Sequence, residues 1–592
     1  MQRLKRSEVP VEQTWDLTDL FADRAAWEAE LDAIARDLPT VTDYKGKLAQ
    51  GPAELAACLD ALEELHKRLL RVSAYANFRF SADGTEPAYQ ADNARSGALW
   101  AQVAAATTFI KSEALALPLE VWIESDAALA EHQYTLRNWL SMKPHTLLPE
   151  TEAALAGLSE VLDAPGRIYG LSKGADMKFE AALDAQGQAH AVYEGGPQLS
   201  PDPVLRRNAY AAFTRGLSSY KTTYAATFAT EVKKNVALAR LRGYASATEM
   251  LLHPHKVTLD VYENILNIIG QELAPHMRRY QKLRQKLMGL DKLMYCDLAA
   301  PMSPADEPSV TWEQAEAWVK AALAVLGEEY HAVIRRAFAE RWIDRADNDG
   351  KRSGAFCNTV YGVHSYVFMT WGNRMRPVFT LAHELGHAGH LSLAGKYNRL
   401  SNVRPPMSII ESPSTMNELL LAQYLLAQPF EAKVRRSVIN GLMGTYHHNF
   451  VNHLLEAELQ RRIYALAEAG KPITEKTLTG TKGQVLAEFW GDAVALDEGA
   501  GLAWMRQPHY YMGLYPYTYA LGLTVSTAAA QAIKEEGQPA VDRWLAVLKA
   551  GGTLTPVELA KLAGVDITQP EPIRKAVAYV GSLVDELEKT LA

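Results

Sequence analysis

Phe379-Thr-Leu-Ala-His383-Glu384-Leu-Gly-His387 is the most informative stretch of this 592-residue chain. Pro377 suits the first turn of a helix, and the apolar residues that follow continue that helix on one side. Residues four apart on a helix are rotated by only about 40° and displaced by about 6 Å, so the imidazoles of His383 and His387 can converge on one metal ion. The stretch therefore predicts a helix with two ligands of a catalytic zinc ion and, between them, Glu384 as the general base.

A third ligand must come from elsewhere, because a catalytic zinc site has three protein ligands and one position open for water. Glu411 in Ser408-Ile-Ile-Glu411-Ser-Pro-Ser is the predicted third ligand, near the start of another helix where Pro413 is tolerated. Glu418 lies seven residues further on, hence on nearly the same helical face. It is predicted to accept a hydrogen bond from a ligating imidazole, although an ordinary paired glutamate would give the same pattern. The expected cofactor is one Zn²⁺ per chain.

Other interpretations of the histidines are less favoured. His390 returns to the face of His383 but one turn farther along, so we predict a neighbour of the site rather than a ligand. A metzincin needs glycine at position 390 and histidine at position 393, where this chain has His390 and Leu393. A chance coincidence, or a buried histidine pair without catalytic function, is disfavoured by the segment around Glu411.

The rest of the chain predicts a mainly α fold with several lobes. Residues 22–160 have apolar positions every three or four residues, which indicates antiparallel helices. A small hairpin is expected within residues 176–194, around the turn at 184–187. The Gly/Pro-rich loop 195–203 divides an amino-terminal helical region, 1–195, from a catalytic region, 196–592. Within the second region, β-branched and aromatic runs in residues 355–371 predict a short hairpin that turns near Gly362.

Composition excludes several classes of function. The net charge of -8 disfavours nucleic-acid and membrane-surface binding. No apolar run is long enough for a membrane span, and the first ten residues do not resemble a signal peptide. The three cysteines, Cys58, Cys296 and Cys357, are too scattered for a disulfide framework or a metal site, so a cytoplasmic location is expected.

Four segments carry a resemblance to a known family: Trp15-Asp-Leu-Thr-Asp-Leu-Phe21, Gly350-Lys-Arg-Ser-Gly-Ala355, the stretch from Phe379 to His387, and Glu411 followed by Asn417-Glu418-Leu-Leu. With them the chain resembles the thimet oligopeptidase family, most closely its oligoendopeptidase F branch, over nearly its whole length. The resemblance implies a helical zinc metallopeptidase with a small β-sheet beside the active site and a deep channel that admits short peptides. It implies cleavage of internal peptide bonds by Glu-assisted attack of zinc-bound water.

The resemblance also suggests residues that contact substrate. A strand bordering the cleft would pair with the peptide backbone, a role that falls to Gly354, Ala355 and Phe356. Serine and glycine are more usual in residues 355–362, which affects the expected substrate preference. In the tyrosine-rich segment after Pro508, the catalytic donors are expected to be His509, Tyr515 and Tyr519, with Tyr511 and Tyr517 as further substrate contacts. So many tyrosines could instead be core aromatics.

Two rival functions remain. A related helical metallocarboxypeptidase typically has His-Glu-Ser-Gln around the third ligand, where this chain has Ile410-Glu411-Ser-Pro. A catalytically silent binding protein would be expected to have lost Glu384, which is present. Short peptides are the expected partners, and the sequence predicts no oligomeric state.

Overall fold

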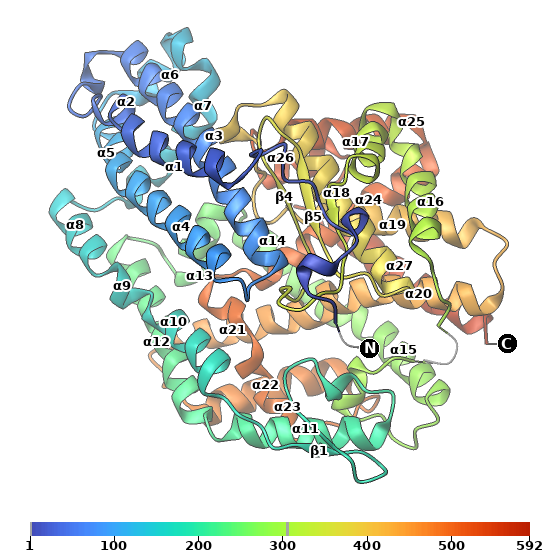
Figure 1. The fold of residues 1–592 in the computed structure, drawn as a ribbon. Coiled ribbons are helices and arrows are strands. Elements are labelled where there is room, and N and C mark those ends of the chain that lie inside the picture. Colours follow the sequence, from blue (N-terminus) through green and yellow to red (C-terminus); the bar gives the residue numbers. More distant parts are fainter. Residues whose placement is uncertain (1–2, 303–306, 592) are drawn as a thin grey trace.

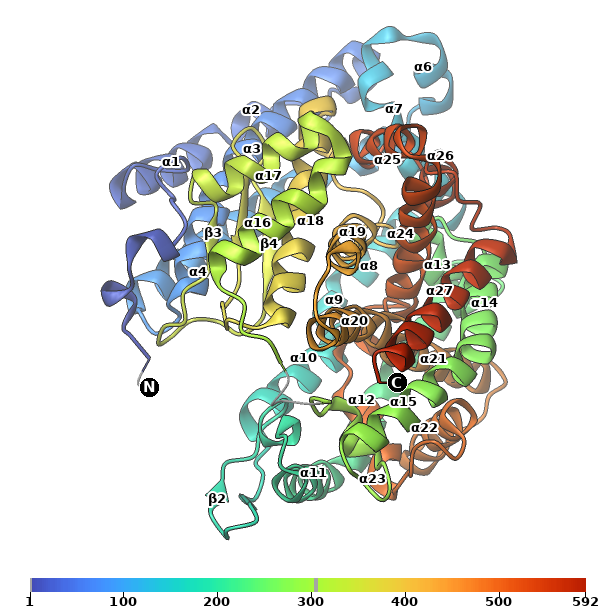
Figure 2. The same cartoon turned by 90° about the vertical axis from the view of Figure 1, so that its right-hand side faces the viewer.

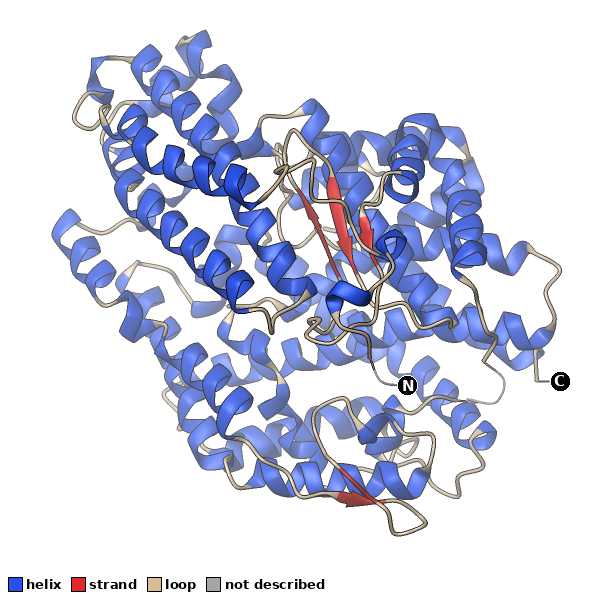
Figure 3. Ribbon diagram, in the orientation of Figure 1, coloured by secondary structure: helices blue, strands red, loops and turns tan. Residues whose placement is uncertain are grey.

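The computed structural model describes residues 3–302 and 307–591, most of which are helical (Figure 3). The amino-terminal helices are α1 (Arg24–Asp37), α2 (Pro39–Thr42), α3 (Pro52–Ala82), α4 (Pro87–Thr107), α5 (Phe109–Leu115), α6 (Leu119–Ser125) and α7 (Gln133–Met142). Three short helices, α8 (Pro149–Gly157), α9 (Ser159–Leu162) and α10 (Ala164–Leu171), run down one side of the molecule toward α11 (Pro203–Ser218) and α12 (Lys221–Leu241) (Figure 1). The predicted mainly α class is confirmed.

The remaining helices surround a central pair, α18 (Met375–Tyr397) and α19 (Ser412–Ala427). Figure 2 shows this pair between the amino-terminal helices on one side and the carboxy-terminal helices on the other. The others are α13 (Ala247–Leu252), α14 (Leu259–Ile268), α15 (Ala274–Leu287), α16 (Trp312–Leu323), α17 (Gly327–Ala339), α20 (Ala432–Tyr446), α21 (His453–Glu468), α22 (Glu475–Trp490), α23 (Glu498–Gly501), α24 (Pro516–Glu536), α25 (Gln538–Ala550), α26 (Pro556–Leu562) and α27 (Pro570–Lys589).

Both predicted hairpins are present. The first pairs β1 (Ala182–Leu183) with β2 (Ala189–His190). The second pairs β4 (Phe356–Thr359) with β5 (Ser365–Phe368) in antiparallel register, with Phe356 opposite Phe368. β3 (Ile343–Asp344) joins β5 in parallel, so the strand order is β3-β5-β4 and β4 is an edge strand. An edge strand has unpaired backbone groups on its outer side, which a peptide can use.

Two hydrophobic cores meet at this sheet. Alternate side chains of a strand point to opposite faces, and β5 follows that rule: Tyr366 and Phe368 belong to the core of the amino-terminal helices, whereas Val367 belongs to the core of the later helices. Trp15 packs against both aromatics of β5, with ring centroids 6.2 and 5.6 Å away. Trp15, near the start of the chain, thus anchors the sheet beside α18.

Among residues 3–302 and 307–591, no helix is long and apolar enough to cross a membrane. The division of the chain at residue 195 stays a prediction.

Candidate metal centre and active site

Two helices that pack unusually closely bring the predicted metal ligands together. His383, Glu384 and His387 lie on α18, while Glu411 is the residue directly before α19. A Cβ atom at Gly386 would lie 2.5 Å from the backbone oxygen of Pro413, a distance that side chains do not tolerate. Only glycine therefore allows α18 to approach the first turn of α19 this closely.

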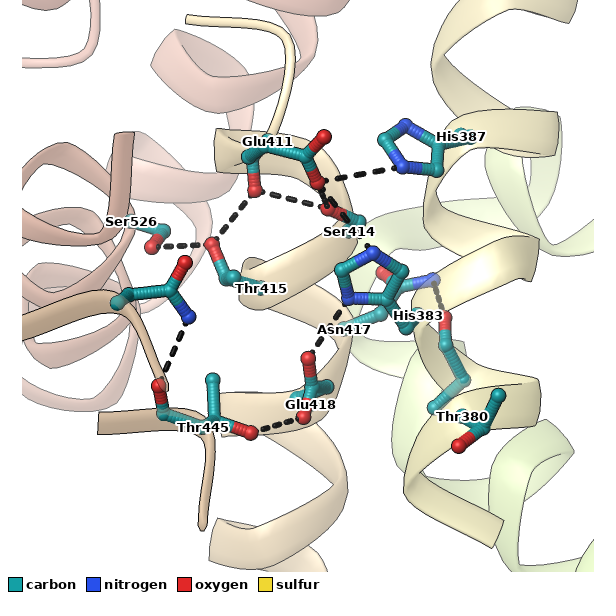
Figure 4. A network of polar contacts seen from close by, with 12 residues as sticks. Thr380, His383, His387, Glu411, Ser414, Thr415, Asn417, Glu418, Thr445 and Ser526 are labelled. Carbon is teal, nitrogen blue, oxygen red and sulfur yellow. Dashed lines mark hydrogen bonds and ion pairs between the residues drawn. The ribbon is translucent and has the colours of Figure 1, made fainter. Parts of the chain in front are cut away.

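Three donor atoms converge between these helices (Figure 4). Oε2 of Glu411 lies 3.3 Å from Nε2 of His383 and 3.4 Å from Nε2 of His387. In the part of the chain that the structure describes, these residues form the one group of three whose donor atoms, all within 4.8 Å of one another, could hold a metal ion. Two imidazole nitrogens and one carboxylate oxygen form the ligand set of many catalytic zinc sites. The residues present fit a zinc ion.

Glu418 fixes the orientation of the first imidazole. Its Oε1 accepts a hydrogen bond of 2.8 Å from Nδ1 of His383, and its Oε2 accepts one from the hydroxyl of Thr445 (Figure 4). Burial alone would favour the neutral acid, but the hydrogen bond from His383 and the charges of His383 and Arg376 hold the pKa of Glu418 below its ordinary value. With Nδ1 engaged as a donor to Glu418, Nε2 faces Glu411, and its lone pair would be available to a metal ion that displaced its proton.

The pKa shifts of His383 and Glu411 show that their surroundings favour a positive charge between them. Burial opposes protonation of His383, yet its hydrogen bonds to Glu411 and Glu418 raise its pKa well above the ordinary value. Burial likewise favours the neutral form of Glu411, but the charge of His387 and the hydrogen bonds from both histidines lower its pKa well below the ordinary value. Glu411 also accepts a hydrogen bond of 3.1 Å from Oγ of Ser414.

Glu384 is nearly inaccessible, with 6% of its surface exposed. Burial raises the pKa of its carboxyl group, against the opposing charges of His383 and His387. Its charge also acts on Cys357 of β4, which places the edge strand beside this carboxylate.

His390 is fully buried and is not one of the three residues whose donor atoms converge. Burial lowers the pKa of His390 to about 3.

The segment that contains Gly354, Ala355 and Phe356 leads into the edge strand. Gly354 is exposed and has a φ of 93°, a conformation that favours glycine, whereas the Phe356 ring stacks on Phe368 at 4.8 Å in the amino-terminal core. The buried ammonium of Lys351 holds the preceding loop.

This ammonium donates to Oδ1 of Asp344 at 2.6 Å and to the backbone oxygens of Asp344, Ala346 and Met369. Arg6 binds the same aspartate. The Gly350-Lys351 motif thus fixes one end of the sheet.

Three of the predicted donors form one cluster. The ring of Tyr515 lies 4.8 Å from His509 and 5.3 Å from Tyr519, measured between centroids. Burial raises the pKa of both tyrosines, and the charge of Glu411 adds to this effect. Burial, with a smaller electrostatic contribution from the neighbouring His448, lowers the pKa of His509 to about 4. All three rings are therefore neutral near pH 7, and each can donate a hydrogen bond.

The other two tyrosines lie differently. Tyr511 is half-buried against Tyr169, with ring centroids 4.9 Å apart, and lines a surface pocket of about 530 Å³ beside α10. Tyr517 has 0% of its surface exposed, and its hydroxyl lies 3.0 Å from Nδ1 of His255. Tyr517 therefore offers no surface to a substrate in this structure.

Sequence reasoning missed two histidines next to these rings. His453 stacks on Tyr519 with ring centroids 4.0 Å apart and an angle of 11°, and His448 meets the same tyrosine at 5.7 Å. The available signal was the crowding of His447, His448 and His453 within seven positions.

Comparison with known proteins agrees with this geometry. The sequence model of peptidase family M3 matches residues 198–579, and that of oligopeptidase F matches residues 118–179. Oligopeptidase PepF of Bacillus subtilis is 33% identical over 99% of this chain and 88% of its own length. A solved structure from Chlamydophila abortus has a TM-score of 0.88 and 26% identity over the whole of both chains. Oligoendopeptidase-F from Enterococcus faecium has a TM-score of 0.73 and 25% identity, covering 95% of this chain and 98% of its own. The resemblance found in the sequence is confirmed: the chain belongs to peptidase family M3 and is a metalloendopeptidase of the oligoendopeptidase F type.

Proposed function

We propose that this chain is a zinc-dependent endopeptidase that hydrolyses internal peptide bonds of short oligopeptides. His383, His387 and Glu411 would hold one zinc ion per chain, and Glu384 would act as the general base. The observation that carries the proposal is the convergence of both Nε2 atoms on Oε2 of Glu411, at 3.3 and 3.4 Å. The names of the relatives support oligopeptides as the substrate class.

When bound, zinc supplies a Lewis acid that polarises the scissile carbonyl and lowers the pKa of water toward neutrality. Glu384 accepts the proton of the attacking water and delivers it to the leaving amine. Because this carboxylate is nearly excluded from solvent, little bulk water competes for its proton. Glu418 keeps the His383 ring in the orientation that directs Nε2 toward the metal position.

The developing oxyanion needs hydrogen-bond donors that are in place before the reaction. Tyr515, Tyr519 and His509 form such a cluster, and their pKa shifts keep all three rings neutral. The peptide backbone would pair with the edge strand along residues 354–358. Tyr511 is a further candidate for contact with the substrate, at the pocket beside α10. We place the enzyme in the cytoplasm because its scattered cysteines suit a reducing compartment.

Two substitutions test these assignments on purified full-length protein. Glu411→Ala is expected to lose zinc and activity together, because a ligand is removed. Glu384→Gln is expected to keep about one zinc per chain and to lower kcat by about 10²–10⁴-fold, because a general base is removed. Metal analysis and cleavage of an internally quenched peptide are measured on the same samples. A Glu411→Ala protein with normal zinc content and activity would overturn the ligand assignment, and an active Glu384→Gln protein would overturn the base.

A further inference from the structure

The helical segment between α20 and α21, next to the active site, is not a regular α-helix. Residues 447–452 form a π-helical turn between α20 and α21. Such turns insert an extra residue into a helix and frequently occur at functional sites. Here the turn brings His448 and His453 together, with their Nε2 atoms 3.2 Å apart.

Gln507 determines which nitrogen of each ring carries the proton. Its Oε1 lies 3.3 Å from the backbone N–H of His509, which can only donate, so the orientation of the carboxamide is fixed. The amide Nε2 then faces Nδ1 of His453 at 3.5 Å and donates to it. Since Nδ1 of His453 accepts, its proton is on Nε2, which donates to Nε2 of His448. The proton of His448 is therefore on Nδ1.

Both rings are neutral in this arrangement, because each has one nitrogen that accepts a hydrogen bond. Desolvation by the surrounding protein lowers the pKa of both histidines. The charges of Arg376 and His383 lower the pKa of His448 further, and those of Glu418 and Glu411 partly oppose them. Thr445, three residues before His448, donates to Glu418, so His448 lies near the metal centre.

His448 also has the exposure that a substrate contact needs. His453 is buried and stacked on Tyr519, whereas His448 is exposed to solvent. Within residues 3–302 and 307–591, Nδ1 of His448 has no hydrogen-bond partner. The relay from Gln507 through His453 thus ends in one oriented, unused N–H group between Tyr519 and the metal centre.

We propose that Nδ1–H of His448 donates a hydrogen bond to a backbone carbonyl oxygen of the bound peptide near the scissile bond, with Gln507 and His453 as positioning residues. This proposal rests on the proposed function, because it names a further contact for the same substrate. The proposed donor differs from the tyrosine hydroxyls, because it belongs to a neutral imidazole, His448, whose tautomer is set by His453 and Gln507.

Two isosteric variants separate the ring nitrogens. The side-chain amide of asparagine coincides with Nδ1 of histidine, and that of glutamine coincides with Nε2. His448→Asn should keep kcat/KM within about threefold, because the donor remains. His448→Gln should lower kcat/KM by about tenfold or more, because it keeps the contact to His453 but leaves the substrate unpaired. Zinc content should be unchanged in both, and His448→Asn should melt at a somewhat lower temperature, because the buried Nε2–H of His453 loses its acceptor.

Equal activities of the two variants, whether both near wild type or both low, would overturn the proposal. A wild-type protein that cleaves no peptide would instead contradict the proposed function. An independent measurement uses metal-free protein labelled with ¹⁵N-histidine, in which long-range proton–nitrogen spectra distinguish the tautomers. The resonances of His448 are assigned by their loss in His448→Asn. We expect the proton on Nδ1, and a proton on Nε2 of His448 would overturn the relay.

Discussion

The imidazole of His383 lies between two carboxylates: Nδ1 donates to Oε1 of Glu418 at 2.8 Å, and Nε2 lies 3.3 Å from Oε2 of Glu411. One carboxylate therefore orients the ring, while the other lies at the opposite nitrogen, Nε2, which is a predicted metal ligand. Glu411 directly precedes α19 and Glu418 lies within it, seven residues later, so the rigidity of one helix maintains both contacts.

Glu418→Gln is expected to weaken zinc binding by about 10–100-fold, because the amide replaces a charged acceptor with a neutral one and makes His383 a weaker ligand. Competition with a fluorescent chelator measures the affinity. The matched control is Thr445→Val, which removes only the hydroxyl bound to the other oxygen of Glu418 and should have a smaller effect. Zinc affinity equal to that of the wild type in Glu418→Gln would show that this contact does not tune the ligand.

Much of the site follows from helical spacing, which is why the sequence predicts it. His383 and His387 are separated by four residues, and Glu411 and Glu418 by seven, so each pair shares a face once a helix is assumed. Both hairpins also follow from local patterns of turn and β-branched residues. Helical spacing also distinguishes the tyrosines. Tyr515 and Tyr519 are four residues apart and share a helical face, whereas Tyr517, two residues from each, lies on another face.

Other features depend on contacts between distant segments. Trp15 packs against Tyr366, more than 300 positions further along the chain. The core of the amino-terminal helices likewise includes residues of β5, which are equally distant in sequence. The pairing of His448 with His453 depends on a π-helical turn, because residues five apart do not face each other on a regular α-helix. No periodicity in one sequence indicates such a turn.

Tyr519→Phe is expected to lower kcat by about 10²–10³-fold without changing zinc content, since one oxyanion donor is lost and the ring remains. Tyr517→Phe is the matched control in the same helix. Its hydroxyl bonds His255 in the core, so this variant should lose some stability but keep its kcat. Thermal melts and steady-state kinetics on both variants make the comparison. Equal kcat values in the two variants would remove Tyr519 from the reaction.

Lys351→Met is expected to destabilise the protein by about 3–5 kcal/mol, because it leaves the buried carboxylate of Asp344 without one of its two cations. The same substitution at Lys282 is the control. That lysine pairs with Asp492 at an exposed position, and such surface pairs contribute about 0–1 kcal/mol. Urea denaturation followed by circular dichroism measures both. If the two variants unfolded at the same urea concentration, Lys351 would not be the anchor of this end of the sheet.

Acidification is expected to destabilise the folded protein, because its buried histidines stay neutral at a pH at which they are protonated in the unfolded chain. The pKa of His390 is lowered from 6.5 to about 3 by burial, and that of His447 likewise to about 3. Between these values and 6.5 the unfolded chain binds a proton that the folded chain does not, so the free energy of unfolding falls as the pH falls. Each such histidine contributes about 1.4 kcal/mol per pH unit in that window.

Removing one of these groups should make the loss less steep. His390→Met fills the buried site with an uncharged side chain of similar length, so the free energy of unfolding should fall less between pH 6 and pH 4 than in the wild type. His190→Gln, in the hairpin of β1 and β2, controls for the loss of a partly exposed histidine that pairs with Asp184. Denaturation is followed on metal-free protein, so that acid release of zinc does not contribute. An unchanged pH dependence in His390→Met would mean that His390 takes up a proton in the folded protein, and that its burial does not keep it neutral.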